Sequence, residues 1–323
     1  MRELRRLLLL SALFLILSAC GALVRNFDVP DPPPEQGVDR YVTVGCVSHH
    51  YLEWEGAKDT IFLLHGFSSS TYTWEDVAPR LAGRGYRVVA LDMKGFGWSD
   101  KPPGADYGPE TLAREVIAFM DAVGIDRPVF VGNSLGGMIA ILCSLEQPSR
   151  FDRLVLIDPA AYPKKTESVL GRNAGSPGGL EFMKMTFCAP MVEGFMLQVF
   201  HDDSLVTPER VTAYFDRLRV PGGLEAQDAV LVGIRELRER GFHERLEDVR
   251  AETLLIWGAE DRWIPVENGC RLRQDIPGAE LVIIPECGHV PQEEAPEKTA
   301  SLIAAFASGV GVIENTHLCP PLQ

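Results

Sequence analysis

The chain has 323 residues, of which 46% are hydrophobic, and it carries a formal net charge of -14 at neutral pH. This length and hydrophobic content suit one large domain with an insertion better than two domains of equal size. The acidic balance excludes nucleic acid as an expected partner, because phosphates repel an acidic surface.

The first nineteen residues have the pattern of a secretory signal peptide. Arg2, Arg5 and Arg6 precede the apolar run LLLLSALFLIL, and small residues follow it. An uncleaved membrane anchor is the alternative, although the run is short for a helix that spans a bilayer. Residues 1–19 are therefore left out of the predicted fold.

The end of this run, LSAC at residues 17–20, resembles the bacterial lipobox. The resemblance implies cleavage before Cys20 and a lipid on its thiol, so that the mature chain is anchored to a membrane. In bacterial lipoproteins an aspartate at the second position after the cysteine implies the inner membrane. This chain has Ala22 at that position, so the resemblance implies the periplasmic face of the outer membrane. The proline-dense stretch VPDPPPEQG favours extended geometry, so residues 20–40 are predicted to form an anchored linker.

The remaining cysteines carry no metal-binding pattern. None of them forms a C-x-x-C pair, and no histidine cluster joins them at ligand spacing, so no structural zinc is expected. An oxidising compartment would allow disulfides, and the pairing stays open. These residues are Cys46, Cys143, Cys188, Cys270, Cys287 and Cys319.

Short apolar runs closed by glycine, proline or aspartate predict strands that are covered on both faces. The runs are YVTVGCV, TIFLLHG, RVVALD, PVFVGNS, LVLIDP, TLLIWG and LVIIPE. Helical patterns lie between them, at residues 74–82, 109–123, 135–147, 266–275 and 296–307. The alternation predicts an α/β fold with a doubly wound, mainly parallel sheet. Its core would comprise residues 41–160 and 249–308, followed by a C-terminal tail over residues 309–323.

The alternation stops between residues 161 and 248, where helical patterns are interrupted by GSPGG and VPGG. This predicts a helical cap over the carboxyl edge of the sheet, where open α/β sheets bind ligands. The methionine- and phenylalanine-rich residues 182–200 would either line an apolar pocket or pack the cap on itself. Arg172, Arg217 and Arg219 are predicted to be solvated surface charges rather than ligands of a substrate carboxylate.

The stretch VFVGNSLGG places Ser134 between a strand and a helix. In that context G-x-S-x-G indicates a nucleophile on a sharp turn, because Gly132 and Gly136 have no side chain to collide where the chain reverses. A serine hydroxyl is a poor nucleophile at neutral pH. It therefore needs a base and a carboxylate that orients the base.

Candidates for the base and for the carboxylate both follow strands later in the sequence. WGAEDRWIP places Asp261 just after one strand, and CGHV places His289 after the next, so both should lie at the same sheet edge as Ser134. Glu260 and Asp158 are the other candidates for the acid, and Asp261 is preferred. We therefore predict a triad of Ser134, His289 and Asp261.

The ordered motifs HGF, DMKGFGWSD, GNSLGG and WGAEDRWIP with CGH resemble those of the α/β-hydrolase superfamily, in its capped lipase, esterase and C–C hydrolase-like branch. The resemblance runs from about Tyr41 to Ala307. It implies an oxyanion hole formed by the backbone N–H groups of Phe67 and Leu135. It also implies a structural role for His65, and a tight loop around Asp92 that borders the site.

These features predict a serine hydrolase that cleaves carboxylic esters of small molecules or lipids through an acyl-enzyme. This mechanism needs no metal or organic cofactor. Ser134 excludes the dehalogenases and epoxide hydrolases, which use a carboxylate nucleophile. C–C hydrolysis of dienoate ring-fission products is the alternative, although such enzymes usually have a tryptophan after the histidine where this chain has Val290. Amide cleavage ranks third, and a non-catalytic lipoprotein on a hydrolase scaffold ranks last.

Overall fold

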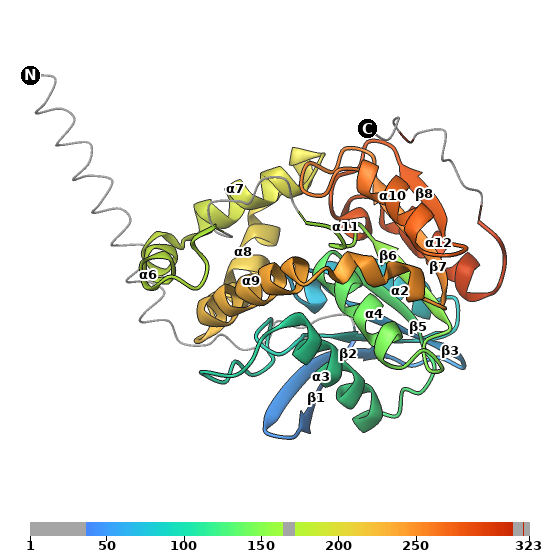
Figure 1. The fold of residues 1–323 in the computed structure, drawn as a ribbon, viewed down its shortest axis with the longest axis horizontal. Helices are drawn as coiled ribbons and strands as arrows, with labels where there is room; N and C mark the ends of the chain where they lie inside the picture. The colour runs from blue at the N-terminus through green and yellow to red at the C-terminus, as the bar shows by residue number, and fades with distance from the viewer. Residues whose placement is uncertain (1–36, 164–171, 313–318, 320–323) are drawn as a thin grey trace, which may run out of the picture.

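The computed structural model describes residues 37–163, 172–312 and 319, and it contains one eight-stranded sheet with helices on both faces (Figure 1). The strand order is β1-β2-β4-β3-β5-β6-β7-β8. β1 and β2 are antiparallel to their neighbours and the other pairs are parallel. The strands are β1 Val38–Val44, β2 Val47–Trp54, β3 Lys58–Leu64, β4 Tyr86–Leu91, β5 Val129–Asn133, β6 Arg153–Ile157, β7 Glu252–Gly258 and β8 Glu280–Ile284. The predicted α/β fold with a mainly parallel sheet is confirmed.

The strand residues alternate between two hydrophobic cores, one on each face of the sheet. In β3, Phe62 and Leu64 belong to one core, whereas Ile61 and Leu63 belong to the other. The first core includes side chains of α3, α4 and α10, and the second includes those of α2 and α12. These helices are α2 Val77–Ala82, α3 Pro109–Ala122, α4 Leu135–Glu146, α10 Glu267–Asp275 and α12 Pro296–Ala307, with the short α11 at Pro291–Glu294.

Helices also fill the interval between β6 and β7, as predicted. The described part of this interval contains α6 Pro177–Thr186, α7 Ala189–Val199, α8 Pro208–Leu218 and α9 Gly223–Glu239. Two 3-10 turns, Asp203–Leu205 and Phe242–Asp248, complete it. In Figure 1 the helices α6 to α9 form a layer beside the sheet, which we call the cap.

The beginning of the sheet differs from the prediction. YVTVGCV is not one strand, because the chain turns at Gly45, where φ is +61°, and returns as the antiparallel β2. β2 escaped the sequence reading because its buried centre contains the polar residues His49 and His50. Residues 38–40, which were assigned to the linker, belong to β1.

The predicted helix over residues 74–82 is also divided. A 3-10 turn at Thr71–Trp74 precedes α2, and the two are separated by Glu75 and Asp76. The turn begins at Ser70, whose hydroxyl accepts the Tyr72 N–H at 3.3 Å. This local capping bond thus starts a helical turn at Thr71, before the predicted start of the helix at residue 74.

The two ends of the chain are described only in part. The predicted signal peptide, Cys20 and residues 20–36 of the linker lie outside the described residues. Within the described part of the chain, no helix has the length and apolar character needed to cross a bilayer. In the tail, Cys319 forms a disulfide with Cys270 of α10, with 5.9 Å between their Cα atoms.

Candidate active site

Four polar residues gather at the carboxyl edge of the sheet. Ser134 and Asp158 directly follow β5 and β6, Asp261 lies shortly after β7, and His289 lies shortly after β8. β5, β6, β7 and β8 are parallel neighbours in the sheet. Parallel neighbours end at one edge, so residues distant in sequence meet there.

Ser134 occupies a strained turn between β5 and α4. Its φ of 53° lies in the left-handed region, which a residue with a side chain rarely adopts. A Cβ on Gly132 would lie 2.4 Å from the carbonyl oxygen of Gly136, and one on Gly136 would lie 2.3 Å from that of Leu64. Both positions therefore require glycine, as the sequence pattern indicated.

His289 and Asp261 form a buried hydrogen-bonded pair. The distance from His289 Nδ1 to Asp261 Oδ2 is 2.6 Å. Asp261 Oδ1 accepts the backbone N–H groups of Trp263 at 2.7 Å and Ile264 at 2.9 Å. An ionised carboxylate only accepts, so His289 Nδ1 carries the proton and Nε2 is left as a base. The structure thus pairs His289 with Asp261 rather than with Glu260, the exposed neighbour of Asp261.

Asn133 joins the serine turn to the histidine loop. Its side-chain N–H group donates to the carbonyl oxygen of His289 at 3.2 Å and to that of Ile157 at 3.2 Å. Among the described residues, the Ser134 hydroxyl makes no hydrogen bond of its own, and in unliganded enzymes the contact between nucleophile and base is often long. Asn133 was not singled out by the sequence analysis, although it is adjacent to the serine.

The backbone groups predicted to form an oxyanion hole lie on two elements beside the serine. Leu135 is the first residue of α4, so its N–H has no acceptor within the helix. Phe67 follows β3, and the neighbouring Gly66 is so close that a Cβ there would lie 3.2 Å from the Cβ of Ser134. The loop after β3 therefore borders the serine.

His65 holds that loop in place. Its Nδ1 bonds to the carbonyl oxygen of Gly66 at 2.8 Å, and its Nε2 accepts the N–H of Met93 at 3.1 Å. Burial lowers the pKa of His65 and favours the neutral ring. Both nitrogens are used within the fold, which agrees with the structural role expected for this residue.

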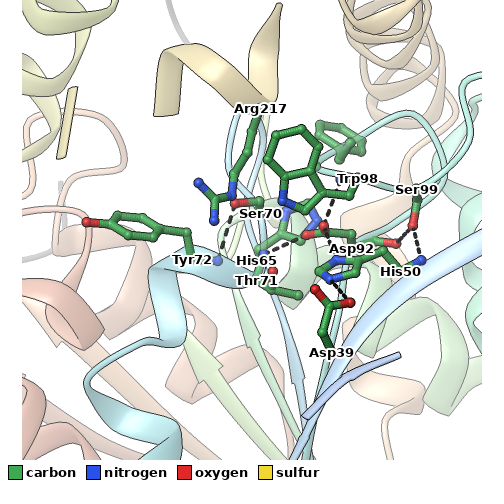
Figure 2. Close-up of polar contacts among 12 residues, drawn as sticks. Asp39, His50, His65, Ser70, Thr71, Tyr72, Asp92, Trp98, Ser99 and Arg217 are labelled. Carbon is green, nitrogen blue, oxygen red and sulfur yellow. Dashed lines mark hydrogen bonds and ion pairs between the residues drawn. The ribbon is translucent and has the colours of Figure 1, made fainter. Parts of the chain in front are cut away.

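Asp92 is the centre of a buried polar cluster that supports the loops around the site (Figure 2). Its Oδ1 accepts the N–H of Thr71 at 2.6 Å, and its Oδ2 accepts the N–H of Trp98 at 2.9 Å and bonds to His50 Nδ1 at 2.7 Å. His50 also lies 3.2 Å from Asp39. Burial alone would raise the pKa of Asp92, but His50 and these hydrogen bonds outweigh it and hold the pKa well below its usual range.

An apolar cavity of about 90 Å³ lies between the cap and the loop that carries Phe67. Its lining contains no charged side chain among the described residues, and its polar members are Ser68, Tyr214 and Gln227. The predicted apolar stretch of residues 182–200 supplies much of the wall. From the cap, the apolar lining residues are Met183, Phe187, Met191, Val192, Phe195, Leu218, Leu224 and Leu231.

Arg217 is not the solvated surface charge that the sequence analysis predicted. It is 3% exposed, and its guanidinium lies 4.9 Å from the ring centre of Tyr72 and 5.4 Å from that of Trp98 (Figure 2). The two aromatic faces attract the guanidinium through cation–π contacts, which contribute to holding this cation in a buried position. Arg172 is exposed as predicted, and Arg219 forms an ion pair with Asp216 at 2.7 Å.

The cap is fastened directly to the histidine loop. The N–H of His289 donates to the carbonyl oxygen of Val199, the last residue of α7, at 2.9 Å. Glu294 accepts the N–H of Gly288 at 2.7 Å with one oxygen and the N–H of His201 at 2.7 Å with the other. Sequence reasoning missed Glu294, because its partner His201 is 93 residues away in the chain.

Asp158, Asp261 and His289 are the one set among the described residues whose potential metal ligands lie within 4.8 Å of one another. His289 Nδ1 is already bonded to Asp261 at hydrogen-bond distance. We therefore interpret the set as a hydrogen-bonded cluster.

Comparison with known proteins identifies the family of this chain. The model of the alpha/beta hydrolase fold family matches residues 59–296, which is most of the chain. The protein belongs to this family and is a hydrolase.

Similar proteins include enzymes of two kinds. A 2-hydroxy-6-oxo-6-phenylhexa-2,4-dienoate hydrolase from Burkholderia cepacia is 32% identical over 256 residues, covering 76% of this chain and 86% of that protein. The structure of a meta-cleavage product hydrolase from Pseudomonas fluorescens IP01 is 28% identical with a TM-score of 0.72, covering 84% of this chain and 98% of the other. The structure of a membrane phospholipase A, a bacterial virulence factor, is 31% identical with a TM-score of 0.71, covering 96% of this chain and 98% of the other.

The Asp92 cluster predicts a stability defect with a defined pH dependence. Asp92→Asn removes a buried charge that three groups bond, so the free energy of unfolding at pH 7 should fall by about 2 to 4 kcal/mol. Because the folded-state pKa is depressed, ionised Asp92 adds stability above about pH 4, and this contribution is lost as the pH falls further. Urea unfolding at pH 7 and below pH 4 measures both effects. If the difference in free energy of unfolding between wild type and Asp92→Asn increased as the pH falls, this assignment would be contradicted.

Proposed function

We propose that this protein is a serine hydrolase that cleaves esters with an apolar acyl group through an acyl-enzyme. The single observation that carries the ester assignment is the cavity beside Phe67, whose described lining is mostly apolar and contains no charged side chain. An aliphatic acyl chain gains free energy there by leaving water. A substrate with two carboxylates would lose its hydration without a cation in that lining to compensate.

The proposed reaction uses the residues at the sheet edge. His289 Nε2 takes the proton of the Ser134 hydroxyl as its oxygen attacks the carbonyl carbon, and Asp261 stabilises the imidazolium. The N–H groups of Phe67 and Leu135 bind the oxyanion, each contributing about 3 kcal/mol to transition-state stabilisation. The imidazolium then gives its proton to the leaving alcohol, and water repeats the cycle on the acyl-enzyme.

C–C hydrolysis of a dienoate is the second candidate, and the names of the relatives favour it over ester cleavage. Several similar proteins besides the Burkholderia cepacia enzyme are hydrolases of 2-hydroxy-6-oxo-dienoates or of the corresponding dioates. The phospholipase A structure, which is aligned over more of this chain, supports ester chemistry instead. Both reactions would use the same three residues, so only substrates separate them.

Turnover of a substrate panel tests the proposal. We expect kcat/KM for p-nitrophenyl octanoate to exceed that for the acetate by about 10-fold or more, because each methylene buried is worth about 0.8 kcal/mol. The same enzyme should turn over 2-hydroxy-6-oxo-6-phenylhexa-2,4-dienoate at least about 100-fold less efficiently than the octanoate. Spectrophotometric assays measure all three rates.

Ser134→Ala is the control for this panel. It should lower every activity by at least about 10³-fold and abolish labelling by a fluorophosphonate probe. A dienoate turned over faster than any ester would replace the ester proposal by the second candidate. Failure of the probe to label wild type at Ser134 would reject both.

The cavity predicts a chain-length effect of one cap residue. Met191→Trp on α7 fills space in the cavity, so kcat/KM for the octanoate should fall by about 10-fold or more while that for the acetate changes by less than about 3-fold. Leu197→Trp is the matched control, because Leu197 lies on the same helix but is exposed and outside the cavity lining. Equal losses on both esters would show that this cavity does not bind the acyl chain.

We also propose that the protein is a lipoprotein held at a membrane through Cys20. The disulfide between Cys270 and Cys319 supports an oxidising compartment, in which such a bond persists. Cells that express the chain should incorporate labelled palmitate into it, and Cys20→Ser should abolish the label and release the protein from the membrane fraction. A Cys20→Ser protein that stays with the membrane would favour an uncleaved anchor.

A further inference from the structure

Asp158 is a buried carboxyl that has no role in the proposed reaction, and one of its oxygens has no hydrogen-bond donor among the described residues. It directly follows β6, it is fully buried, and its φ of 44° lies in the left-handed region. Its Oδ1 accepts the N–H of Gly258 at 3.0 Å. Its Oδ2 is buried but receives no N–H or O–H from any described residue. A charged oxygen in that position would be costly, because it has lost its water and gained no donor.

The negative charge of Asp261 makes an ionised Asp158 still less favourable. Potential ligand atoms of Asp158, Asp261 and His289 all lie within 4.8 Å of one another. Two ionised carboxylates at that separation in a buried site repel each other strongly, and such pairs keep one proton between them.

The hydrogen bonds decide which of the two carboxyls holds the proton. Asp261 accepts two backbone N–H groups and the ring of His289, all of which favour its ionised form. Asp158 accepts one N–H in all. Burial and the charge of Asp261 raise the pKa of Asp158, and Glu294 adds to the effect. The other titratable group at this place is the buried thiol of Cys287.

We propose that Asp158 carries a proton at neutral pH and donates it from Oδ2 to the carboxylate of Asp261, which makes Asp158 a positioning residue for the Asp261–His289 pair. Asp158 and Asp261, which the sequence analysis treated as alternative candidates for the acid, would then act together. The carboxyl pair would keep a single negative charge, and the neutral acid would hold Asp261 against His289. The kinetic consequence rests on the proposed function, whereas the protonation itself does not.

Replacement of Asp158 by a neutral isostere tests this assignment. In Asp158→Asn the amide oxygen can accept the Gly258 N–H and the amide N–H group can donate to Asp261. We therefore expect kcat/KM within about 3-fold of wild type and an unchanged acidic limb of its pH profile. Asp158→Leu removes the donor, so kcat should fall by about 10-fold or more with little change in KM. Asp126→Asn, at an exposed carboxyl, is the matched control.

Two kinetic results would overturn the proposal. One is a loss in Asp158→Asn as large as that in Asp158→Leu. The other is an acidic limb that moves to lower pH in Asp158→Asn, because removing an ionised carboxylate beside His289 would lower the pKa of its imidazolium. If Asp158→Leu does not fold, as judged by circular dichroism, the Asn variant alone decides between these outcomes.

Infrared spectroscopy provides a readout that needs no activity. Wild-type protein at neutral pH should show the C=O stretch of a protonated carboxyl that is missing from Asp158→Asn and present in Asp126→Asn. Identical carboxyl bands in all three proteins would overturn the proposal. Loss of Ser134 labelling together with a normal Asp158 band would instead reject the proposed function and leave Asp158 as assigned.

Discussion

The hydrogen bond between His289 Nδ1 and Asp261 is the interaction on which the proposed mechanism depends. It fixes the proton on one ring nitrogen and thereby leaves the other free of a proton, as the proposed activation of Ser134 requires. The bond exists because β5, β7 and β8 are parallel members of one sheet whose carboxyl ends meet. The backbone topology therefore places residues 134, 261 and 289 at the same edge of the sheet.

Around this pair, polar groups do the positioning that apolar packing cannot do. Asn133 connects the serine turn to the histidine loop, and His65 holds the loop after β3. Asp92 accepts backbone N–H groups of Thr71 and Trp98 and so connects the 3-10 turn to the loop after β4. Each of these contacts is buried and directional, so each fixes one backbone segment with respect to another. The strained φ of Ser134 persists because such contacts over-determine its surroundings.

The sequence predicts the parts of this site that follow from local pattern. Gly132 and Gly136 predict the turn, because no residue with a side chain fits at either position. The apolar runs predict the parallel strands. β2 was missed because the buried pair His49 and His50 breaks the apolar pattern, and their partners are far away in the chain. The burial of Arg217 was missed for a related reason, since the aromatic rings that cover it belong to Tyr72 and Trp98, which are far from it in the chain. The bridge from Glu294 to His201 likewise depends on how the cap sits on the sheet, which periodicity does not encode.

Nuclear magnetic resonance of ¹⁵N-histidine-labelled protein tests the central pair most directly. At neutral pH the ring of His289 should be in the Nδ1–H form, with its proton shifted strongly downfield by the bond to Asp261, and Asp261→Asn should remove that resonance while the fold is kept. A His289 ring in the Nε2–H form, or a downfield proton that survives in Asp261→Asn, would contradict the account.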